Sequence, residues 1–465
     1  MTDIAWLGVA EAGRLIGSTQ LSPVEYVEHL LTRIERIDPK LDAFLEVTAD
    51  VARQRARAAE TEIAAGRRIG PLHGVPYGLK DIVDYAGVRT TGHSKILADN
   101  VAEVHAGVTE RLEAAGAILL GKTATHEFAF GGPSFDLPWP PARNPWNPDH
   151  HPGGSSSGSG AAVAAGLLPM AIGTDTGGSV RNPASMCGIV GIKPTYGLVS
   201  RRGVLPLSFS LDHVGPMTRS VEDNALMLQA IAAHDPRDPG SADVPVPDML
   251  RDLDKGISGL RIGVVRHFYE EDMEAAPEMA AAIEAAMDVF RDMGATVGTA
   301  RLPPLQRYAA CNRVILMSEA YAVHERWLQE RPEDYAHLTR KRLLPGAFIR
   351  AVDYVQAMRT RAQLVAEFEE VMRDFDLLVT VSSMEPACAI ADLQEVERTY
   401  PRQARTPFNV IGCPALALPT GFSSDGMPLA MQIVGRAFDE PTVFRAGHAY
   451  EKAVGRSERR PEIAA

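Results

Sequence analysis

Three short segments of the sequence hold residue types from which nucleophilic catalysis is built. They are GLKD with Lys80, GGSSSGSG with Ser155 and GTDTGGSVR with Ser179. An amide carbonyl is a poor electrophile, so a serine that attacks it must be activated and the resulting oxyanion must be held. The two glycine-rich segments predict turns that bring backbone N–H groups close to a ligand. Taken singly, each serine is equally compatible with a solvated hydroxyl in a loop, so the segments have to be judged together.

A flexible linker is the other interpretation of the glycine run at residues 153–160. It is disfavoured by position, because seven prolines and two tryptophans stiffen residues 133–152 before it and the apolar stretch AAVAAGLL follows it.

Other motifs match functional patterns but lack the context that the chemistry needs. Residues 116–123 fit the phosphate-binding loop pattern, yet their apolar middle is itself a predicted strand and a helix precedes it. Residues 154–158 fit the nucleophile elbow of α/β hydrolases without the strand that must come before it. The DTG at residues 175–177 has no second copy, and His150 and His151 have no third metal ligand at an obvious spacing. We therefore expect neither a nucleotide site nor a metal site.

The composition narrows the class of protein. The 465 residues include 47 Lys and Arg against 59 Asp and Glu, which gives a net charge of −12, and 45% of the residues are hydrophobic. Such a composition is typical of a globular protein, and the acidic balance argues against a nucleic-acid partner. The four cysteines form no CxxC pair, which fits a reducing compartment. With no signal-peptide pattern and no long apolar run, we predict a cytoplasmic protein without membrane association.

The elements that must position the serines and the lysine alternate between helix and strand. Ser22, Pro23 and Glu25 form an N-cap, a proline at the first helical position and a capping-box acid. Further helices are expected at residues 51–65, 104–115, 274–293, 308–329 and 347–375. Apolar runs predict buried strands at residues 260–265, 376–381, 415–419 and 429–435. We expect an α/β protein with a large mixed, mostly buried β-sheet surrounded by α-helices.

The segments of Lys80, Ser155 and Ser179, in this order and spacing, resemble the amidase signature family. GIKPTYGLVS follows them as in the family, and the similarity extends to SLDHVGPMTRS, FNVIGCPALALP and GMPLAMQIVG. The resemblance implies the amidase signature fold as a single domain over residues 1–465. Residues 241–375 are the least similar part and are predicted to be mostly helical.

The resemblance also implies a triad of two serines and a lysine. Carried over by position, Ser179 is the nucleophile that forms an acyl-enzyme, Ser155 takes the cis-serine position, and neutral Lys80 is the base. The implied oxyanion hole consists of backbone N–H groups of Thr176, Gly177, Gly178 and Ser179. Asp175 and Arg181 are implied as a supporting ion pair behind the nucleophile turn, and Lys193 is expected to have a structural role as well. No cofactor and no metal are implied.

The base role requires an uncharged lysine, whereas the unperturbed pKa of lysine lies about three units above neutrality. Burial away from a paired carboxylate would lower the pKa of Lys80. Asp81 follows directly and would oppose this if it faced the amine. In an extended segment, the two side chains point to opposite faces.

The activity implied by the resemblance is that of an amidohydrolase, which cleaves carboxylic amide C–N bonds to an acid and ammonia or an amine. One alternative is the A subunit of a tRNA-dependent glutamyl/aspartyl amidotransferase, which would need two partner subunits and a tunnel for ammonia. Another is a noncatalytic binding member of the fold. We expect a small-molecule amide substrate, favour aryl amides with aryl esters or carbamates as relatives, and leave a monomer and a homodimer open.

Residues just before the glycine turn are candidates for a substrate pocket, although core packing explains their aromatic rings equally well. The pocket candidates are Phe128, Phe130, Gly131, Gly132 and Trp139. In the segment 241–375, helical spacing predicts a lid over the site, with core packing as the alternative. The lid candidates are Met317, Tyr321, Tyr354 and Met358.

Overall fold

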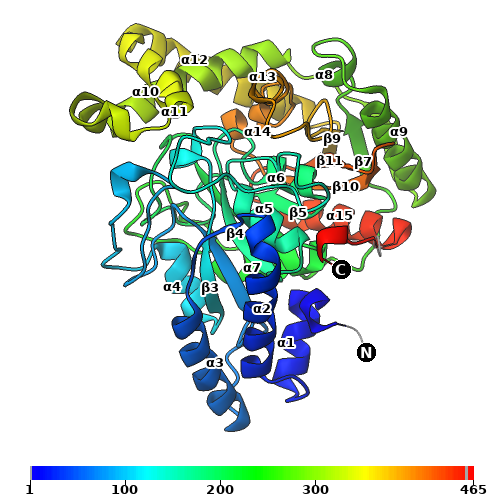
Figure 1. Ribbon diagram of the computed structural model, residues 1–465. Helices are drawn as coiled ribbons and strands as arrows, with labels where there is room; N and C mark the ends of the chain where they lie inside the picture. The colour runs from blue at the N-terminus through cyan, green and yellow to red at the C-terminus, as the bar shows by residue number, and fades with distance from the viewer. Residues whose placement is uncertain (1–2, 456–458, 465) are drawn as a thin grey trace.

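A single mixed sheet of 11 strands lies at the centre of the computed structural model, which describes residues 3–455 and 459–464 (Figure 1). In spatial order the strands are β1 (Phe44–Val47), β3 (Ile118–Thr123), β2 (Pro76–Lys80), β4 (Met170–Asp175), β6 (His213–Thr218), β5 (Val190–Lys193), β10 (Ala415–Phe422), β11 (Pro428–Val434), β9 (Leu377–Val381), β7 (Arg261–Val264) and β8 (Thr296–Thr299). Strand β2 pairs in parallel with both β3 and β4, whereas the pairs from β4 across to β9 are antiparallel. The predicted large mixed sheet is confirmed.

Helices surround this sheet. They are α1 (Val9–Gly17), α2 (Pro23–Ile37), α3 (Ala49–Ala64), α4 (Gly107–Ala114), α5 (Ser157–Ala164), α6 (Arg181–Cys187), α7 (Val221–Ile231), α8 (His267–Glu270), α9 (Pro277–Asp292), α10 (Leu305–Glu330), α11 (His337–Leu343), α12 (Ala351–Val371), α13 (Leu393–Thr399), α14 (Thr406–Ile411) and α15 (Glu440–Val454). The Ser22 hydroxyl caps α2 by accepting hydrogen bonds from the N–H groups of Val24 and Glu25, as its position predicted.

Four predicted helix starts are wrong by three or four residues, and proline explains two of them. Helix α4 begins at Gly107 instead of residue 104, and α10 begins at Leu305 instead of residue 308. Helix α9 begins at Pro277 instead of residue 274, because the residue before a proline avoids helical geometry. Helix α12 begins at Ala351, since the predicted start at residue 347 falls within a short 3-10 turn, Leu344–Phe348, that contains Pro345.

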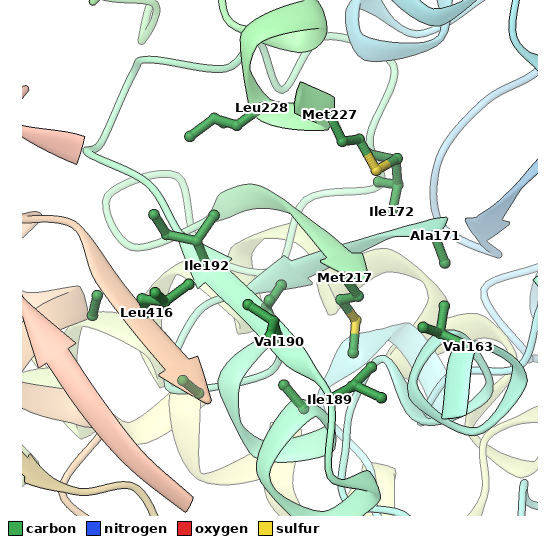
Figure 2. Close-up of a cluster of buried hydrophobic side chains, with 14 of the residues drawn as sticks. Val163, Ala171, Ile172, Ile189, Val190, Ile192, Met217, Met227, Leu228 and Leu416 are labelled. Carbon is green, nitrogen blue, oxygen red and sulfur yellow. The ribbon is translucent and has the colours of Figure 1, made fainter. Parts of the chain in front are cut away.

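The inner strands of the sheet are buried on both faces, as their apolar runs predicted, whereas the edge strands β1 and β8 are partly exposed. Figure 2 shows Ala171 and Ile172, neighbours on β4, pointing to opposite sides. Ala171 lies near Val163 of α5, and Ile172 lies near Met227 of α7. All four side chains are fully buried. The alternation of side chains along a strand thus places a helix-covered layer on each face.

Residues 241–375, the part of the sequence that resembles the family least, also contribute to the sheet, because β7 and β8 form one of its edges. The helices α10, α11 and α12 of the same segment gather at one end of the molecule, opposite α1 to α3 (Figure 1). Tyr321, Tyr354 and Met358 are partly buried against the core, and Tyr354 donates a hydrogen bond to Glu319 (2.7 Å). Their role in a lid, and that of Met317, stays a prediction. None of the helices in the part of the chain that the structure describes has the length and apolar character of a bilayer-crossing segment.

Candidate active site

Lys80 is the last residue of β2, and its side chain is fully buried. Its Nζ atom lies 2.7 Å from Ser155 Oγ and 2.8 Å from Thr174 Oγ1. Thr174 reaches the same place because β4 runs parallel to β2, so their carboxyl ends meet at one edge of the sheet. Burial lowers the pKa of Lys80 to about 7, although Asp175 and Asp212 oppose this shift. The amine is therefore largely uncharged slightly above neutral pH.

Asp81 follows Lys80 but faces another set of partners. Its carboxylate lies 2.9 Å from Lys122 Nζ and accepts a hydrogen bond from the backbone N–H of Thr91 (2.9 Å). The separate partners of Lys80 and Asp81 agree with the prediction that the two side chains point to opposite faces of an extended segment.

Ser155 lies in the turn that leads into α5, and the Gly154–Ser155 peptide bond is cis. The Ser155 carbonyl accepts a hydrogen bond from the His126 backbone N–H (3.0 Å), and the Gly154 N–H donates to Asn182 Oδ1 (2.8 Å). A Cβ atom on Gly154 would collide with the His126 ring, so only glycine fits at this point of the turn.

Ser179 lies in the next turn, between β4 and α6, and is 6% exposed. Its carbonyl accepts a hydrogen bond from the Ser156 N–H (3.3 Å), which ties the two serine turns together. Within residues 3–455 and 459–464, the Ser179 hydroxyl makes no hydrogen bond. The structure thus brings Lys80 and Ser155 into contact, and a contact between Ser155 and Ser179 stays a prediction.

The backbone N–H groups of the predicted oxyanion hole differ in availability. The Gly178 N–H is engaged, because it donates to Asp175 Oδ1 at 2.8 Å. The N–H groups of Gly177 and Ser179 have no hydrogen-bond partner among the described residues. A Cβ on Gly177 would come no closer than 3.9 Å to any neighbour, Thr406 Oγ1. Gly178 therefore contributes less to the predicted hole than its place in the motif indicated.

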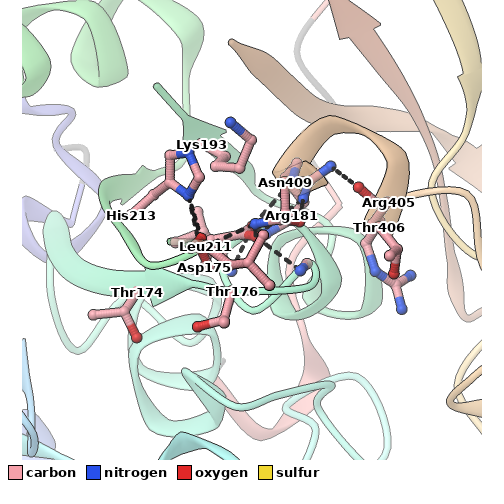
Figure 3. Close-up of polar contacts among 12 residues, drawn as sticks. Thr174, Asp175, Thr176, Arg181, Lys193, Leu211, His213, Arg405, Thr406 and Asn409 are labelled. Atoms are coloured by element: carbon pink, nitrogen blue, oxygen red, sulfur yellow. Dashed lines mark hydrogen bonds and ion pairs between the residues drawn. The ribbon is translucent and has the colours of Figure 1, made fainter. Parts of the chain in front are cut away.

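Asp175 and Arg181 form a fully buried ion pair behind the nucleophile turn (Figure 3). Arg181 donates from Nε and Nη2 to the carboxylate, each at 3.0 Å, and from Nη1 to Gln432 Oε1 at 2.7 Å. Asn409 also donates to Asp175 (2.8 Å). Burial would raise the pKa of Asp175, but the Arg181 guanidinium holds it well below its usual range. The pair connects β4 to the C-terminal part of the sheet.

Lys193 is a second fully buried lysine beside this ion pair (Figure 3). Its Nζ donates to the carbonyls of Pro194 (2.9 Å) and Cys413 (2.6 Å), and burial lowers the pKa of Lys193 to about 7. These contacts join the end of β5 to the chain that enters β10, and they do not include Lys80, Ser155 or Ser179.

A cavity of about 450 Å³ lies beside Thr174 and Thr176. Apolar side chains of residues 204–207 form part of its wall, together with Tyr196 and Phe209. Arg201 also lines it and lies over the Tyr196 ring at 4.6 Å. Thr174 both lines this cavity and contacts the Lys80 amine, whereas Lys80, Ser155 and Ser179 are not among its lining residues.

The predicted pocket residues pack largely against other parts of the chain. Phe128 is buried among rings of α10 and its neighbourhood, with His324 at 4.5 Å and Trp327 at 5.9 Å. The carbonyls of Phe130 and Gly131 accept hydrogen bonds from Arg342 (3.2 and 2.8 Å). A Cβ atom on Gly132 would collide with the Leu338 side chain. The Trp139 carbonyl lies 3.1 Å from His93 Nε2. Ala129 is the residue of this stretch that lines the cavity. A role for the other residues in substrate binding stays a prediction.

Sequence reasoning missed several polar side chains that complete the site. Thr174 precedes Asp175 in the same motif, and strand alternation could have placed it on the Lys80 side. Asp212, whose carboxylate accepts a hydrogen bond from Thr176 Oγ1 (2.6 Å), and Asn409 lie in distant segments that resemble the family, but nothing in those segments singles out these two side chains. Among the described residues, no group of three or more His, Cys, Asp and Glu side chains is arranged to hold a metal ion.

Comparisons with known proteins place the whole chain among related enzymes. The model of a family described as Amidase matches residues 25–444. The A subunit of the glutamyl-tRNA(Gln) amidotransferase of Chloroflexus aggregans is 39% identical, with all of both chains covered. A structure described as a vestigial protein complex that reveals the origins of an s-triazine catabolic enzyme has a TM-score of 0.91 and 34% identity, over 98% of this chain and all of that one. Native peptide amidase from Stenotrophomonas maltophilia has a TM-score of 0.88 and 31% identity, over 99% of each chain.

Proposed function

The chain belongs to the amidase signature family, whose enzymes act on amide C–N bonds, and we propose that it hydrolyses a carboxamide through an acyl-enzyme on Ser179. The observation that carries the proposal is the buried Lys80 amine, whose hydrogen-bond partners are a serine and a threonine hydroxyl and which, among the described residues, contacts no carboxylate. A lysine in that setting can accept a proton near neutral pH.

In the proposed reaction, Lys80 accepts the proton of the Ser155 hydroxyl while Ser155 accepts that of Ser179. The Ser179 oxygen then attacks the amide carbon, and its electron pair forms the new C–O bond as the carbonyl oxygen becomes an oxyanion. The N–H groups of Gly177 and Ser179, which have no hydrogen-bond partner among the described residues, are the proposed donors for that oxyanion. As the oxyanion's electron pair restores the C=O bond, the C–N bond breaks, and the proton returns through Ser155 to the nitrogen, which departs as ammonia or an amine. Water then attacks the ester carbon and gives its proton to Lys80 through Ser155. The C–O bond to Ser179 breaks, the acid leaves, and the proton passes back to the Ser179 oxygen.

The buried ion pair of Asp175 and Arg181 supports this reaction indirectly. It fixes the loop that carries Ser179, because Asp175 also accepts hydrogen bonds from the N–H groups of Gly178 and Val180 (2.8 and 3.1 Å). We propose that these contacts keep the nucleophile turn in one conformation, so that the oxyanion donors need no rearrangement.

A fluorophosphonate probe followed by intact-mass measurement tests the nucleophile. We expect one adduct on the wild-type protein, located at Ser179 by peptide mapping, and none on Ser179→Ala. Ser157→Ala is a matched control, because Ser157 opens α5 next to the same turn but contacts the Ala124 carbonyl (3.4 Å). An adduct that persists on Ser179→Ala would refute the assignment.

Lys80→Met tests the base. We expect labelling to slow by about 10²–10⁴-fold, the usual range for loss of a general base. The matched control is Lys193→Met, which removes the other buried lysine whose pKa lies at about 7 but whose partners are carbonyl groups. Equal rates in the two lysine variants would contradict the assignment of Lys80.

The similar proteins indicate whether this chemistry takes place in a subunit of a larger enzyme or in a stand-alone amidase. The amidotransferase sequence from Chloroflexus aggregans matches over its whole length, and this favours an amidotransferase subunit over the stand-alone amidohydrolase that sequence reasoning put first. We therefore propose, as the setting, an A subunit that releases ammonia from glutamine for a partner protein. The stand-alone enzyme remains the second candidate, supported by the similarity to peptide amidase.

Activity assays on the purified chain distinguish the amidotransferase subunit from the stand-alone amidase. The chain alone is assayed for ammonia release from glutamine, a peptide C-terminal amide and an aryl amide. Preference for glutamine, with a rate that rises on addition of the purified partner subunits of a glutamyl-tRNA(Gln) amidotransferase, would support the amidotransferase setting. Full turnover of the peptide or aryl amide by the chain alone would support the stand-alone amidase.

A further inference from the structure

A third buried lysine and a buried carboxylate form an ion pair directly behind the candidate base. Lys122 on β3 and Asp81, the residue after Lys80, lie 2.9 Å apart between Nζ and Oδ1. Their side chains are 0% and 2% exposed, so solvent does not screen the two charges. Burying such a pair costs desolvation free energy, and removing one partner destabilises the protein because it leaves an unpaired buried charge.

Both members of the pair have complete sets of partners. Besides Asp81, Lys122 Nζ donates to the Arg89 carbonyl and to Thr90 Oγ1, each at 2.9 Å, which uses all three of its protons. The other oxygen of Asp81 accepts hydrogen bonds from the N–H (2.9 Å) and the hydroxyl (2.5 Å) of Thr91. The carboxylate is therefore held in one place, away from the Lys80 amine.

The strand register explains how two lysines on neighbouring strands acquire different partners. Lys122 pairs in register with Leu79, and Thr123 pairs with Lys80. Because side chains alternate along a strand, Lys122 and Asp81 share one face of β2 and β3, while Lys80 lies on the other. The sheet thus separates the ion-paired lysine from the candidate catalytic one.

We propose that Lys122 is a positioning residue of the active site, which binds the Asp81 carboxylate and so leaves the Lys80 amine free to contact Ser155. The inference rests on the proposed function, because it concerns how Lys80 is kept available as the base. Without Lys122, an unpaired buried carboxylate would remain one residue from Lys80 and would favour its charged form.

Other charged groups face the two residues in the wild-type protein. Asp175 and Asp212 act on Lys80, but Arg181 pairs with the first, and hydrogen bonds from Thr176 and from the backbone N–H groups of residues 207 and 208 hold the second. His126 also lies within electrostatic range of Lys80. Asp84 and His93 lie within electrostatic range of Asp81. Changing Lys122 alone alters none of these side chains, and the double variant that also removes the Asp81 charge separates the effect of the unpaired carboxylate from that of the lost ammonium.

The test is the rate of fluorophosphonate labelling of Ser179 as a function of pH, which needs no knowledge of the natural substrate. The variants are Lys122→Met, Lys122→Gln, which keeps a hydrogen-bond donor without the charge, and the double variant Lys122→Gln with Asp81→Asn. Lys452→Met is the matched control, because Lys452 forms an exposed ion pair with Asp254 (2.9 Å). Circular dichroism checks that each variant is folded.

We expect the midpoint of the pH–rate curve to rise by about one unit in both single variants. The rate at pH 6 then falls about tenfold, whereas the double variant and Lys452→Met keep the wild-type midpoint. A lower rate at an unchanged midpoint in the single variants would mean a merely structural role and would overturn the inference. If only the double variant folds, a wild-type midpoint supports the inference and a shifted one overturns it. Absence of a Ser179 adduct on the wild-type protein would instead refute the proposed function.

Discussion

The rate of acylation of Ser179 should depend on pH through the charge of Lys80. Burial of this amine lowers its pKa from 10.5 to about 7, although Asp175 and Asp212 oppose the shift. Only the uncharged amine accepts a proton, so the rate should rise with pH and level off above about pH 8. Relative to the plateau, a pKa of about 7 predicts about one-tenth of the rate at pH 6 and about one-hundredth at pH 5.

The assay is the second-order rate constant for fluorophosphonate labelling between pH 5 and pH 9, measured by intact mass. Lys193→Met is the control, since burial places the pKa of Lys193 at about 7 as well, while its Nζ donates to the Pro194 and Cys413 carbonyls. That variant should keep the midpoint near pH 7. A rate that is flat from pH 5 to pH 9, or a midpoint that moves with Lys193→Met and not with Lys80→Arg, would refute the reasoning.

The same structure makes predictions about stability. Lys80→Met should raise the free energy of unfolding by about 2–4 kcal/mol at pH 7, because the unfolded chain binds a proton that the folded protein binds weakly, and the gain over wild type should shrink towards pH 10. Gly178→Ala should abolish labelling, since its φ of +126° and the guanidinium beside it leave no room for a Cβ, whereas Gly177→Ala, with open space around it, should fold and melt like wild type in calorimetry. Arg181→Met should cost about 3–5 kcal/mol in urea unfolding, because it leaves the buried carboxylate of Asp175 unpaired.

Much of the fold could be predicted because its strands are continuous apolar runs. The runs around β7, β9, β10 and β11 predicted strands within a few residues of the observed bounds. The order of strands in the sheet could not be predicted, since it depends on pairings such as β5 with β10, whose residues lie more than 200 positions apart in the chain. Periodicity reports which face of a strand is buried, and it carries no information on the neighbour.

The candidate site was predictable where it is encoded in contiguous motifs. The segments of Lys80 and Ser155 placed two residues that the structure brings within 2.7 Å. The aromatic pocket was less accessible to sequence reasoning. Phe128 is aromatic, as pocket residues often are, but its ring lies against His324 of α10. A single sequence cannot distinguish a ring that faces substrate from one that faces a distant helix.

The choice of catalytic lysine shows most directly what the fold adds to the sequence. Lys80, Lys122 and Lys193 each end or nearly end an apolar strand, and all three are fully buried. Their acceptors differ: Lys122 forms an ion pair with a carboxylate, and Lys193 faces two backbone carbonyls that cannot give up a proton. Lys80 faces hydroxyl groups, which can exchange a proton with a neutral amine. Burial alone therefore selects no base, and the reactivity of each lysine follows from the chemistry of the groups that the sheet register places around it.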